Sequence, residues 1–208
     1  MPSSQPVSSQ STSSVSKFDR SHDEIMKAAA RLFRDKGYAA STLRDIAAAA
    51  GMKAGSLYYH FDSKEEILDA ILDAGVRQVH DSVQAVIREG KEADRLAVVS
   101  AAARTHLTVL LARSEFTSVN MRIFGLLPAE IRARHLPLRR AYTRLWEKLL
   151  RDAQRAGRLR ADIEIKPLRR FLLAALNSTV EWFDPEREDV DAVAERCTGL
   201  ILRGIAPD

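Results

Sequence analysis

The stretch from Ser41 to Phe61, STLRDIAAAAGMKAGSLYYHF, constrains the fold of this chain more than any other. Its pattern predicts two short helices joined by a tight turn. Thr42 can cap the first helix through its side-chain oxygen, and apolar residues then recur at the spacing of one helical face. Gly51 follows, where a chain leaving a helix often takes a left-handed conformation that glycine adopts at low cost. We therefore expect a positioning helix, a turn and a second helix that exposes its side chains.

The second predicted helix begins with small and basic residues and continues with an aromatic run. Bulky side chains at a helix start would hold it away from a phosphate backbone, so Lys53 followed by three small residues suits contact with DNA. Leu57 and Phe61 point to the core, which leaves the aromatic run between them facing outward. This is the layout of a helix-turn-helix, whose recognition helix enters the major groove. An ordinary pair of packed helices with an aromatic surface is the alternative.

The motif T-x-R-D-I-A-x-x-A-G, followed by G-S-L-Y-Y-H-F and S-K-E-E-I-L, resembles the N-terminal domain of TetR-family transcriptional regulators. The resemblance is close from about Asp23 to Leu72 and architectural beyond. It implies an all-α chain of about nine helices: a three-helix helix-turn-helix DNA-binding domain, then a helical ligand-binding and dimerisation domain. It also implies that Lys64 contacts a DNA phosphate. The predicted DNA-binding residues are Thr42, Arg44, Lys53, Ala54, Gly55, Ser56, Tyr58, Tyr59, His60 and Lys64.

The distribution of charge agrees with a DNA-binding N-terminal segment. The formal net charge of the chain is +4, and nine basic against six acidic residues place most of it on the segment up to Lys64. Release of counterions from DNA requires such a positive excess. A solvated charged surface is the alternative, because the excess is modest.

We expect three regions along the 208 residues. Residues 1–16 are rich in Ser and Gln and lack charged side chains, which predicts a disordered arm. Residues 17–62 form the expected DNA-binding domain, and residues 63–208 form the expected ligand-binding and dimerisation domain. No run approaches the ~20 apolar residues of a membrane span, no apolar signal-peptide core is present, and the single Cys197 excludes an intramolecular disulfide. These features predict a cytoplasmic protein without a membrane partner.

The C-terminal region contains polar and aromatic residues within apolar helical stripes, and these are candidates for a ligand pocket. Packing in the core is the alternative for each, and for His106 it is the more frequent outcome. The arginine-rich stretch from Glu130 to Arg140 is either a solvated face or a pocket mouth for an anionic ligand. This stretch loosely resembles regulators of acyl-CoA thioesters or other amphipathic acids, and a drug-like or lipid ligand is the alternative. The predicted ligand-binding residues are His106, Asn120, Met121, Phe124, Tyr142, Trp146, Leu173 and Asn177.

Two amphipathic segments end the chain. Pro167 opens the first, as proline does in the first turn of a helix, and Asp184-Pro185 ends it. Two such helices after a ligand-sized domain favour pairing with their copies in a second subunit as a four-helix bundle. The predicted dimer-interface residues are Leu168, Phe171, Leu172, Ala175, Val190, Val193, Cys197, Leu200 and Ile201.

Together these features predict a ligand-responsive transcriptional regulator, by family analogy most often a repressor, that binds a pseudo-palindromic operator as a homodimer. The effector would favour a spacing of the two DNA-binding domains that no longer fits the groove. No phosphate loop and no G-x-G-x-x-G, H-E-x-x-H or G-x-S-x-G motif is present. We therefore expect no enzyme activity, no cofactor and no metal. The alternative is a helical small-molecule-binding protein or an enzyme with an interaction-only N-terminal domain.

Overall fold

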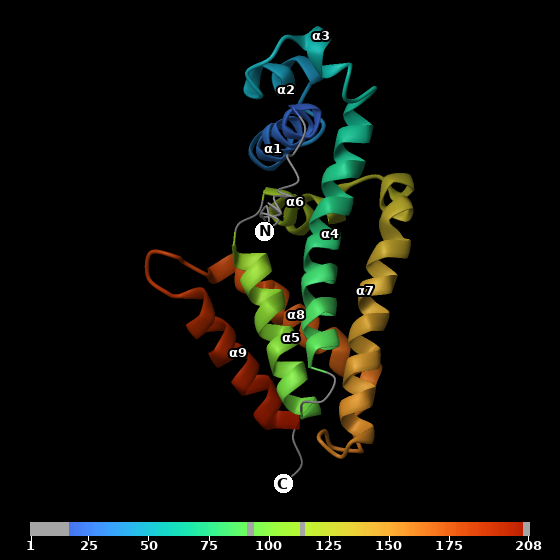
Figure 1. Ribbon diagram of the computed structural model, residues 1–208, viewed down its shortest axis with the longest axis vertical. Coiled ribbons are helices and arrows are strands. Elements are labelled where there is room, and N and C mark those ends of the chain that lie inside the picture. The colour runs from blue at the N-terminus through green and yellow to red at the C-terminus, as the bar shows by residue number, and fades with distance from the viewer. Residues whose placement is uncertain (1–16, 91–93, 113–114, 206–208) are drawn as a thin grey trace, which may run out of the picture.

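The computed structural model describes residues 17–90, 94–112 and 115–205. Within these ranges all regular elements are helices, and they form a small headpiece at one end of a larger helical body (Figure 1). The prediction of an all-α chain is confirmed, with nine α-helices in the described part. The predicted disordered arm, residues 1–16, lies outside the described residues.

The headpiece consists of α1 (Lys17–Lys36), α2 (Leu43–Ala49) and α3 (Ala54–Leu57). The apolar spacing from Ile25 to Phe33 predicts a helix that starts near Ser21 and ends at Gly37, and helix α1 begins earlier than this, at Lys17. It ends as predicted before Gly37, whose φ of 88° lies in the left-handed region that glycine enters without strain. The three helices pack around one hydrophobic core, which they share with residues of helices later in the chain.

Local signals set both ends of α2 as predicted. Thr42 Oγ1 accepts a hydrogen bond from the Asp45 amide at 3.1 Å, and the Asp45 carboxylate accepts one from the Thr42 amide at 3.0 Å. Gly51 has a φ of 68°, the left-handed conformation expected after this helix. Helix α3 is shorter than the expected recognition helix. Only one turn from Ala54 is helical, and hydrogen-bonded turns carry the backbone on to His60.

In the sequence, Ser63 and Glu66 predict a capping box, and an apolar stripe after it predicts a helix to about Glu89. Helix α4 (Lys64–Glu89) ends at the predicted residue and connects the headpiece to the body (Figure 1). Ser63 caps it by accepting a hydrogen bond from the Glu66 amide at 3.1 Å. The Glu66 carboxylate reaches back to the amide of Asp62 at 2.7 Å, one residue before the amide that a capping box uses. The predicted cap by Ser63 is therefore present, but Glu66 accepts from the amide of Asp62 instead of that of Ser63.

The body contains α5 (Arg95–Leu111), α6 (Glu115–Ile123), a 3-10 turn η1 (Phe124–Leu126), α7 (Ala129–Arg155), α8 (Ile165–Trp182) and α9 (Val190–Ile205). Helix α7 is continuous although Pro137 lies inside it. The sequence predicts an amphipathic helix only from about Tyr142, after the arginine-rich stretch from Glu130 to Arg140. The structure joins the two segments into one helix.

Two hydrophobic cores hold the molecule together, and α4 contributes to both. Ile67 and Leu72 pack in the headpiece core with residues of α1, α2, α3, α6 and the start of α7. Val79 and Val83 pack in the body core with residues of α5, α7, α8 and α9. The headpiece core thus extends beyond residue 62, where the sequence places a domain boundary.

A buried histidine fastens α7 to the upper half of α4. The His135 ring nitrogens lie 2.8 Å from Asp73 Oδ1 and 2.9 Å from Asp69 Oδ1. Arg134 adds a salt bridge to Asp69 at 2.9 Å. Arg134 and His135, in the arginine-rich stretch, therefore do not simply face solvent. They hold α7 against α4.

In the described part of the chain, no single helix is long and apolar enough to cross a membrane. The bent pair formed by α5 and the segment Glu115–Leu126, whose axes differ by 94°, reaches that length and composition only when both are counted together.

Candidate DNA interface and effector site

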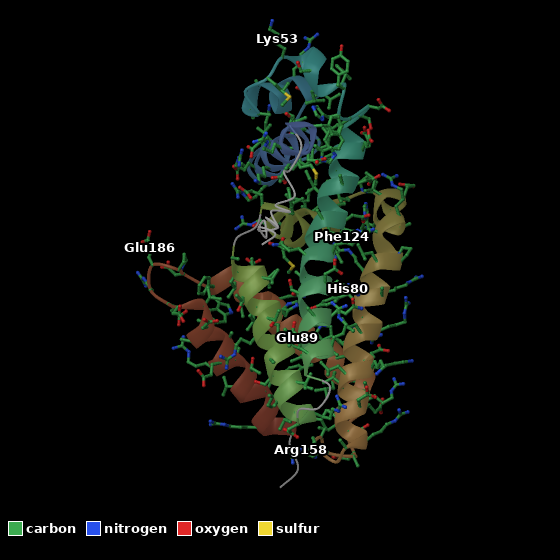
Figure 2. The ribbon with its side chains drawn as sticks, in the orientation of Figure 1. Lys53, His80, Glu89, Phe124, Arg158 and Glu186 are labelled. Atoms are coloured by element: carbon green, nitrogen blue, oxygen red, sulfur yellow. The ribbon has the colours of Figure 1, made fainter. Side chains whose placement is uncertain are left out.

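The tip of the headpiece presents the candidate DNA-contacting face. Lys53 precedes α3 at the far end of the molecule and points away from the body (Figure 2). The side chain of Tyr59 is 84% exposed and that of Tyr58 is 56% exposed. Aromatic side chains usually bury much of their surface in a core or an interface. Exposed rings beside a basic side chain therefore suit contact with a nucleic acid.

The other predicted residues on this face differ in how far they reach solvent. Four are exposed, namely Thr42, Arg44, Gly55 and Ser56, and Ala54 is half-buried. The Thr42 oxygen already accepts the capping hydrogen bond, but its hydroxyl can still donate to a phosphate oxygen. Gly55 has open space around its α-carbon, so nothing in the headpiece prevents close approach of a groove wall.

His60 and Lys64 are less accessible than the other predicted DNA-contacting residues. The His60 ring lies 4.4 Å from the Phe18 ring, centroid to centroid, and its Nδ1 is buried without a hydrogen-bond partner. The Lys64 ammonium donates to the carbonyl oxygens of Tyr38 at 3.0 Å and Ser41 at 2.9 Å. It also lies 4.4 Å from the centroid of the Tyr38 ring. Both residues hold the headpiece together, and DNA contact by them stays a prediction.

A further hydrogen bond joins the headpiece to the first turn of α4. The Tyr38 hydroxyl donates to Glu65 Oε1 at 2.8 Å. This bond lowers the pKa of Glu65, and burial raises the pKa of Tyr38, so the pair remains a phenol and a carboxylate at neutral pH. Lys64 and Glu65 together fix how the headpiece sits on α4.

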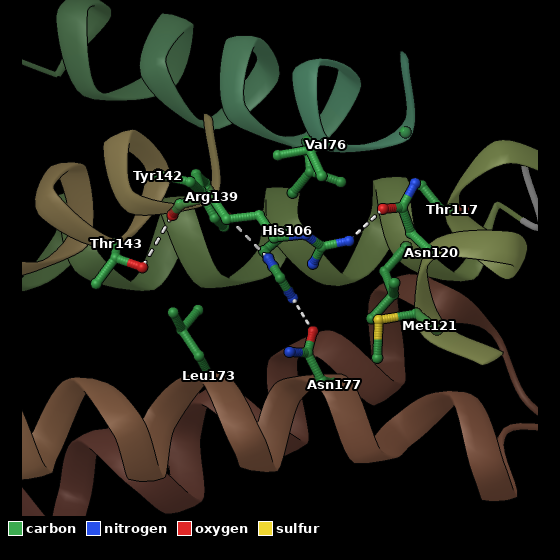
Figure 3. A pocket seen from close by; sticks show the side chains of 13 residues that line it. Val76, His106, Thr117, Asn120, Met121, Arg139, Tyr142, Thr143, Leu173 and Asn177 are labelled. Carbon is green, nitrogen blue, oxygen red and sulfur yellow. Dashed lines mark hydrogen bonds between the residues drawn. The ribbon is translucent and has the colours of Figure 1, made fainter. Parts of the chain in front are cut away.

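A cavity of about 210 Å³ lies in the body, and residues of α4, α5, α6, α7 and α8 line it (Figure 3). Apolar walls with a small number of convergent polar groups are typical of small-molecule sites. The lining residues are Gly75, Val76, Val79, His106, Leu110, Thr117, Asn120, Met121, Arg139, Tyr142, Thr143, Leu173 and Asn177.

His106 is the centre of a buried hydrogen-bond chain in this cavity (Figure 3). Its Nδ1 lies 2.8 Å from the Tyr142 hydroxyl, and its Nε2 lies 3.0 Å from Asn177 Oδ1. Burial lowers the pKa of His106 to about 4, so the ring is neutral near pH 7. An amide oxygen only accepts, so Nε2 carries the proton and Nδ1 accepts from Tyr142. The amide NH₂ of Asn177 is left as a donor.

Asn120 connects the cavity to the contact between α4 and α6. Its Nδ2 donates to the carbonyl oxygens of Leu72 at 3.1 Å and Phe116 at 3.0 Å. The two helices approach so closely here that a Cβ added to Gly75 would lie 2.7 Å from the Phe116 carbonyl oxygen. Helix α6 also contacts α1, through a 3.2 Å salt bridge between Glu115 and Arg31. The cavity wall is therefore continuous with the support of the headpiece.

Six of the eight residues predicted to bind a ligand line this cavity, and two do not. Trp146 is fully buried in the body core, and Phe124 lies beneath the guanidinium of Arg139 without lining the cavity. Arg139 lines the cavity although it is not among the predicted ligand-binding residues; it belongs to the arginine-rich stretch for which a pocket mouth was one of two interpretations. A signal was available, since Arg139 precedes Tyr142 by three residues on one helix and such residues share a face.

The predicted dimer-interface residues separate into two groups. Leu168, Leu172 and Val193 are buried in the body core of one chain, so these three assignments are corrected: helices of the same chain cover them. Phe171 is 66% exposed and Leu200 is 76% exposed. The remaining four residues, Ala175, Val190, Cys197 and Ile201, are half-buried.

An exposed recognition segment on a three-helix headpiece, joined by one long helix to a body with a cavity, defines a helix-turn-helix regulator with a separate ligand-binding body. A family model described as "Bacterial regulatory proteins, tetR family" matches residues 25–71. Another, described as "Tetracyclin repressor-like, C-terminal domain", matches residues 92–205. The chain belongs to the TetR family of bacterial transcriptional regulators.

Individual relatives and solved structures match nearly the whole chain. The HTH-type transcriptional repressor KstR2 of Rhodococcus jostii (strain RHA1) is 32% identical over 185 residues, covering 88% of this chain and 90% of that protein. The crystal structure of superantigen PfiT is similar with a TM-score of 0.74 at 29% identity, covering 93% of this chain and 100% of that one. AibR in complex with isovaleryl coenzyme A and operator DNA shares the fold, with a TM-score of 0.76 at 24% identity over 86% of this chain and 97% of that one.

Proposed function

We propose that this protein is a cytoplasmic transcriptional repressor that binds a pseudo-palindromic operator as a homodimer and releases it when a small effector enters the cavity. The observation that carries the proposal is the face formed by Lys53, Tyr58 and Tyr59. Lys53 projects from the end of the headpiece that is farthest from the body (Figure 2), and the two tyrosines, which follow α3 directly, are exposed. Rings this exposed contribute little to the headpiece core, whereas DNA would cover them.

Each residue of this face has a role that follows from its chemistry. The Lys53 ammonium and the Tyr58 hydroxyl suit phosphate oxygens, which fix the register of a protein on the duplex. Gly55, Ser56 and Tyr59 follow at the start of the recognition segment, where a helix-turn-helix reaches the base edges. The short side chains of the first two allow the backbone to approach the groove.

Homodimerisation would use the outer faces of α8 and α9. Phe171 and Trp182 on α8 and Leu200 on α9 are large apolar side chains that are more than half exposed in the single chain. Isolated exposed apolar residues are common, but three on two adjacent terminal helices favour an interface. A four-helix bundle of α8 and α9 with their copies would cover them.

Effector control requires that the ligand bind one arrangement of the dimer better than another. The cavity supports such a coupling because its walls include α4, which carries the headpiece, and α6, which contacts both α4 and α1. A ligand that changes the packing of these helices would change the separation of the two headpieces. The effector we propose is small and either amphipathic or hydrophobic, in keeping with the mainly apolar lining.

DNA binding can be tested with genomic fragments selected by the full-length protein and measured by fluorescence anisotropy. The double variant Lys53→Ala, Tyr59→Ala should bind the selected DNA at least ten-fold more weakly, with an unchanged circular dichroism spectrum. The slope of log K against log salt should fall by about one for each headpiece bound, because each loses one phosphate contact. Arg151→Ala, which removes an exposed charge from α7, is the matched control. Undiminished binding by the double variant would refute the assigned DNA face.

We also propose that the chain has no catalytic role. The alternative is a small-molecule-binding protein or an enzyme whose headpiece contacts another protein. Selection of genomic fragments by the full-length protein separates these two functions. Only a DNA-binding headpiece would enrich fragments that share a sequence with two half-sites about one helical turn apart. Failure to enrich any fragment would favour the alternative.

A further inference from the structure

Arg139 is the one basic side chain in the lining of the cavity, within the described residues. It extends from α7 toward α6, where its Nη2 donates to Asn120 Oδ1 (Figure 3). Its guanidinium carbon lies 3.5 Å from the centroid of the Phe124 ring. The Nε atom is buried and has no hydrogen-bond partner. At least one donor of this cation is therefore unused.

No carboxylate of the described residues forms an ion pair with Arg139, unlike several nearby arginines. Arg134 on the same helix pairs with Asp69, and Arg169 on α8 pairs with Glu147. Burial lowers the pKa of Arg139 to about 10, and no acidic neighbour offsets this effect. A charge withdrawn from water without a counter-ion is costly. An anion supplied from outside the chain would remove much of that cost.

We propose that Arg139 binds the carboxylate of a small organic acid whose apolar body fills the cavity. This proposal rests on the effector site proposed above and specifies the chemistry of its ligand. The buried, unpartnered Nε and the neighbouring Nη2 form one side of the guanidinium fork, and a carboxylate that displaces the Asn120 oxygen would accept from both in parallel. Val79, Leu110 and Leu173 supply apolar walls for the rest of the molecule.

The charge and volume of the site limit the acid further. One guanidinium neutralises one negative charge, whereas a phosphate monoester carries about −1.5 to −2 at neutral pH. A monocarboxylate therefore matches the site better. The cavity of about 210 Å³ is also smaller than the ~300–1,000 Å³ of common small-molecule sites. The apolar body of the acid is accordingly compact or short.

The position of Arg139 places the acid at a contact between helices. Nη2, which the carboxylate would share, is the atom that now donates to Asn120. Asn120 in turn holds the backbone carbonyls of Leu72 on α4 and Phe116 on α6. A carboxylate that competes for Nη2 would release the Asn120 oxygen and loosen this junction. Binding of an acid would thus change the packing of α4 against α6, the two helices that support the headpiece.

The experiment measures thermal unfolding of the full-length protein with butanoate, hexanoate and octanoate, and with the matching neutral amides. At least one acid should raise the melting temperature in a saturable way, and its amide should not. Arg139→Gln should weaken the apparent affinity for that acid by about ten-fold or more, as expected for loss of a charge-assisted bidentate contact. Arg140→Gln removes the neighbouring exposed charge and should leave the affinity unchanged. Arg139→Lys keeps the positive charge but not the guanidinium fork, so its affinity for the acid should lie between those of Arg139→Gln and Arg140→Gln.

The proposal is overturned by equal shifts with acid and amide, by an Arg139→Gln variant with full affinity, or by no shift with any acid. Should Arg139→Gln fail to fold, reduced affinity in Arg139→Lys supports the proposal and full affinity opposes it. Release of DNA is measured separately with the same acids. An acid that binds through Arg139 without releasing DNA supports this inference and contradicts the proposed effector response.

Discussion

Replacement of Gly75 by alanine tests how tightly α6 packs on α4. The added Cβ would contact Asn120 Nδ2 and would lie 2.7 Å from the carbonyl oxygen and 2.9 Å from the carbonyl carbon of Phe116. Backbone atoms cannot move aside as the end of a flexible side chain can, so α6 must shift. Overpacking of this kind costs about 1–3 kcal/mol. Weakening the two Asn120 hydrogen bonds costs about 1 kcal/mol more.

One term opposes this loss, since alanine stabilises a helix interior by about 1 kcal/mol relative to glycine. We therefore expect Gly75→Ala to lower the free energy of unfolding by about 2 kcal/mol. Urea unfolding followed by circular dichroism at fixed protein concentration measures the change, because the stability of a dimer depends on concentration. Gly204→Ala is the control: its added Cβ meets nothing within 4 Å, so stability should stay the same or rise slightly. If Gly75→Ala matched the wild type, the described approach of α4 and α6 would be wrong.

Three further outcomes are expected. The pKa of His106, lowered to about 4 by burial, lies below that of the unfolded chain, so the unfolded state takes up a proton first as pH falls. The free energy of unfolding should not depend on His106 above about pH 6.5 and should decrease by up to about 3 kcal/mol between pH 6.5 and 4. Urea unfolding of His106→Gln at a series of pH values should show a weaker decrease. Equal pH dependence in the wild type and the variant would contradict a buried neutral ring. The wild type should sediment as a dimer at micromolar concentration, and Leu200→Asp should sediment as a monomer, because a carboxylate on the proposed interface would be buried unpaired; an unchanged sedimentation coefficient would place the interface elsewhere. Ser63→Ala should lower the free energy of unfolding by about 1 kcal/mol through loss of the α4 cap, which urea unfolding would detect.

Features set by neighbouring residues could be predicted from the sequence. The caps at Thr42 and Ser63 and the left-handed turn at Gly51 depend on backbone groups within a few residues, and all three are confirmed. The length of α3 could not be predicted in the same way. One helical turn followed by hydrogen-bonded turns places Leu57 and Phe61 much as a longer helix would, so the apolar spacing does not separate the two.

Features set by distant residues were predicted only in part. His106 and Asn177 were identified as polar residues on apolar helices, but the sequence around each does not show that the two side chains form a hydrogen bond. Arg139 resembles its solvated neighbours in sequence, and it is α6 crossing beside it that buries it. Leu168 was assigned to a dimer surface because an apolar stripe looks alike whether its cover comes from the same chain or from another.

The length of α4 has a mechanical consequence. Its 26 residues form a rod about 39 Å long, and the headpiece is fixed to one end while the cavity lies beside its middle, at Gly75, Val76 and Val79. The part of α4 between the cavity and the headpiece is about 18 Å long, so a tilt of about 5° at the cavity moves the headpiece end by about 2 Å. Two such helices in a dimer would change the distance between the recognition segments by up to about 3 Å, against half-sites about 34–36 Å apart. Under the proposed effector response, a small repacking beside the cavity would therefore change the spacing of both segments on DNA.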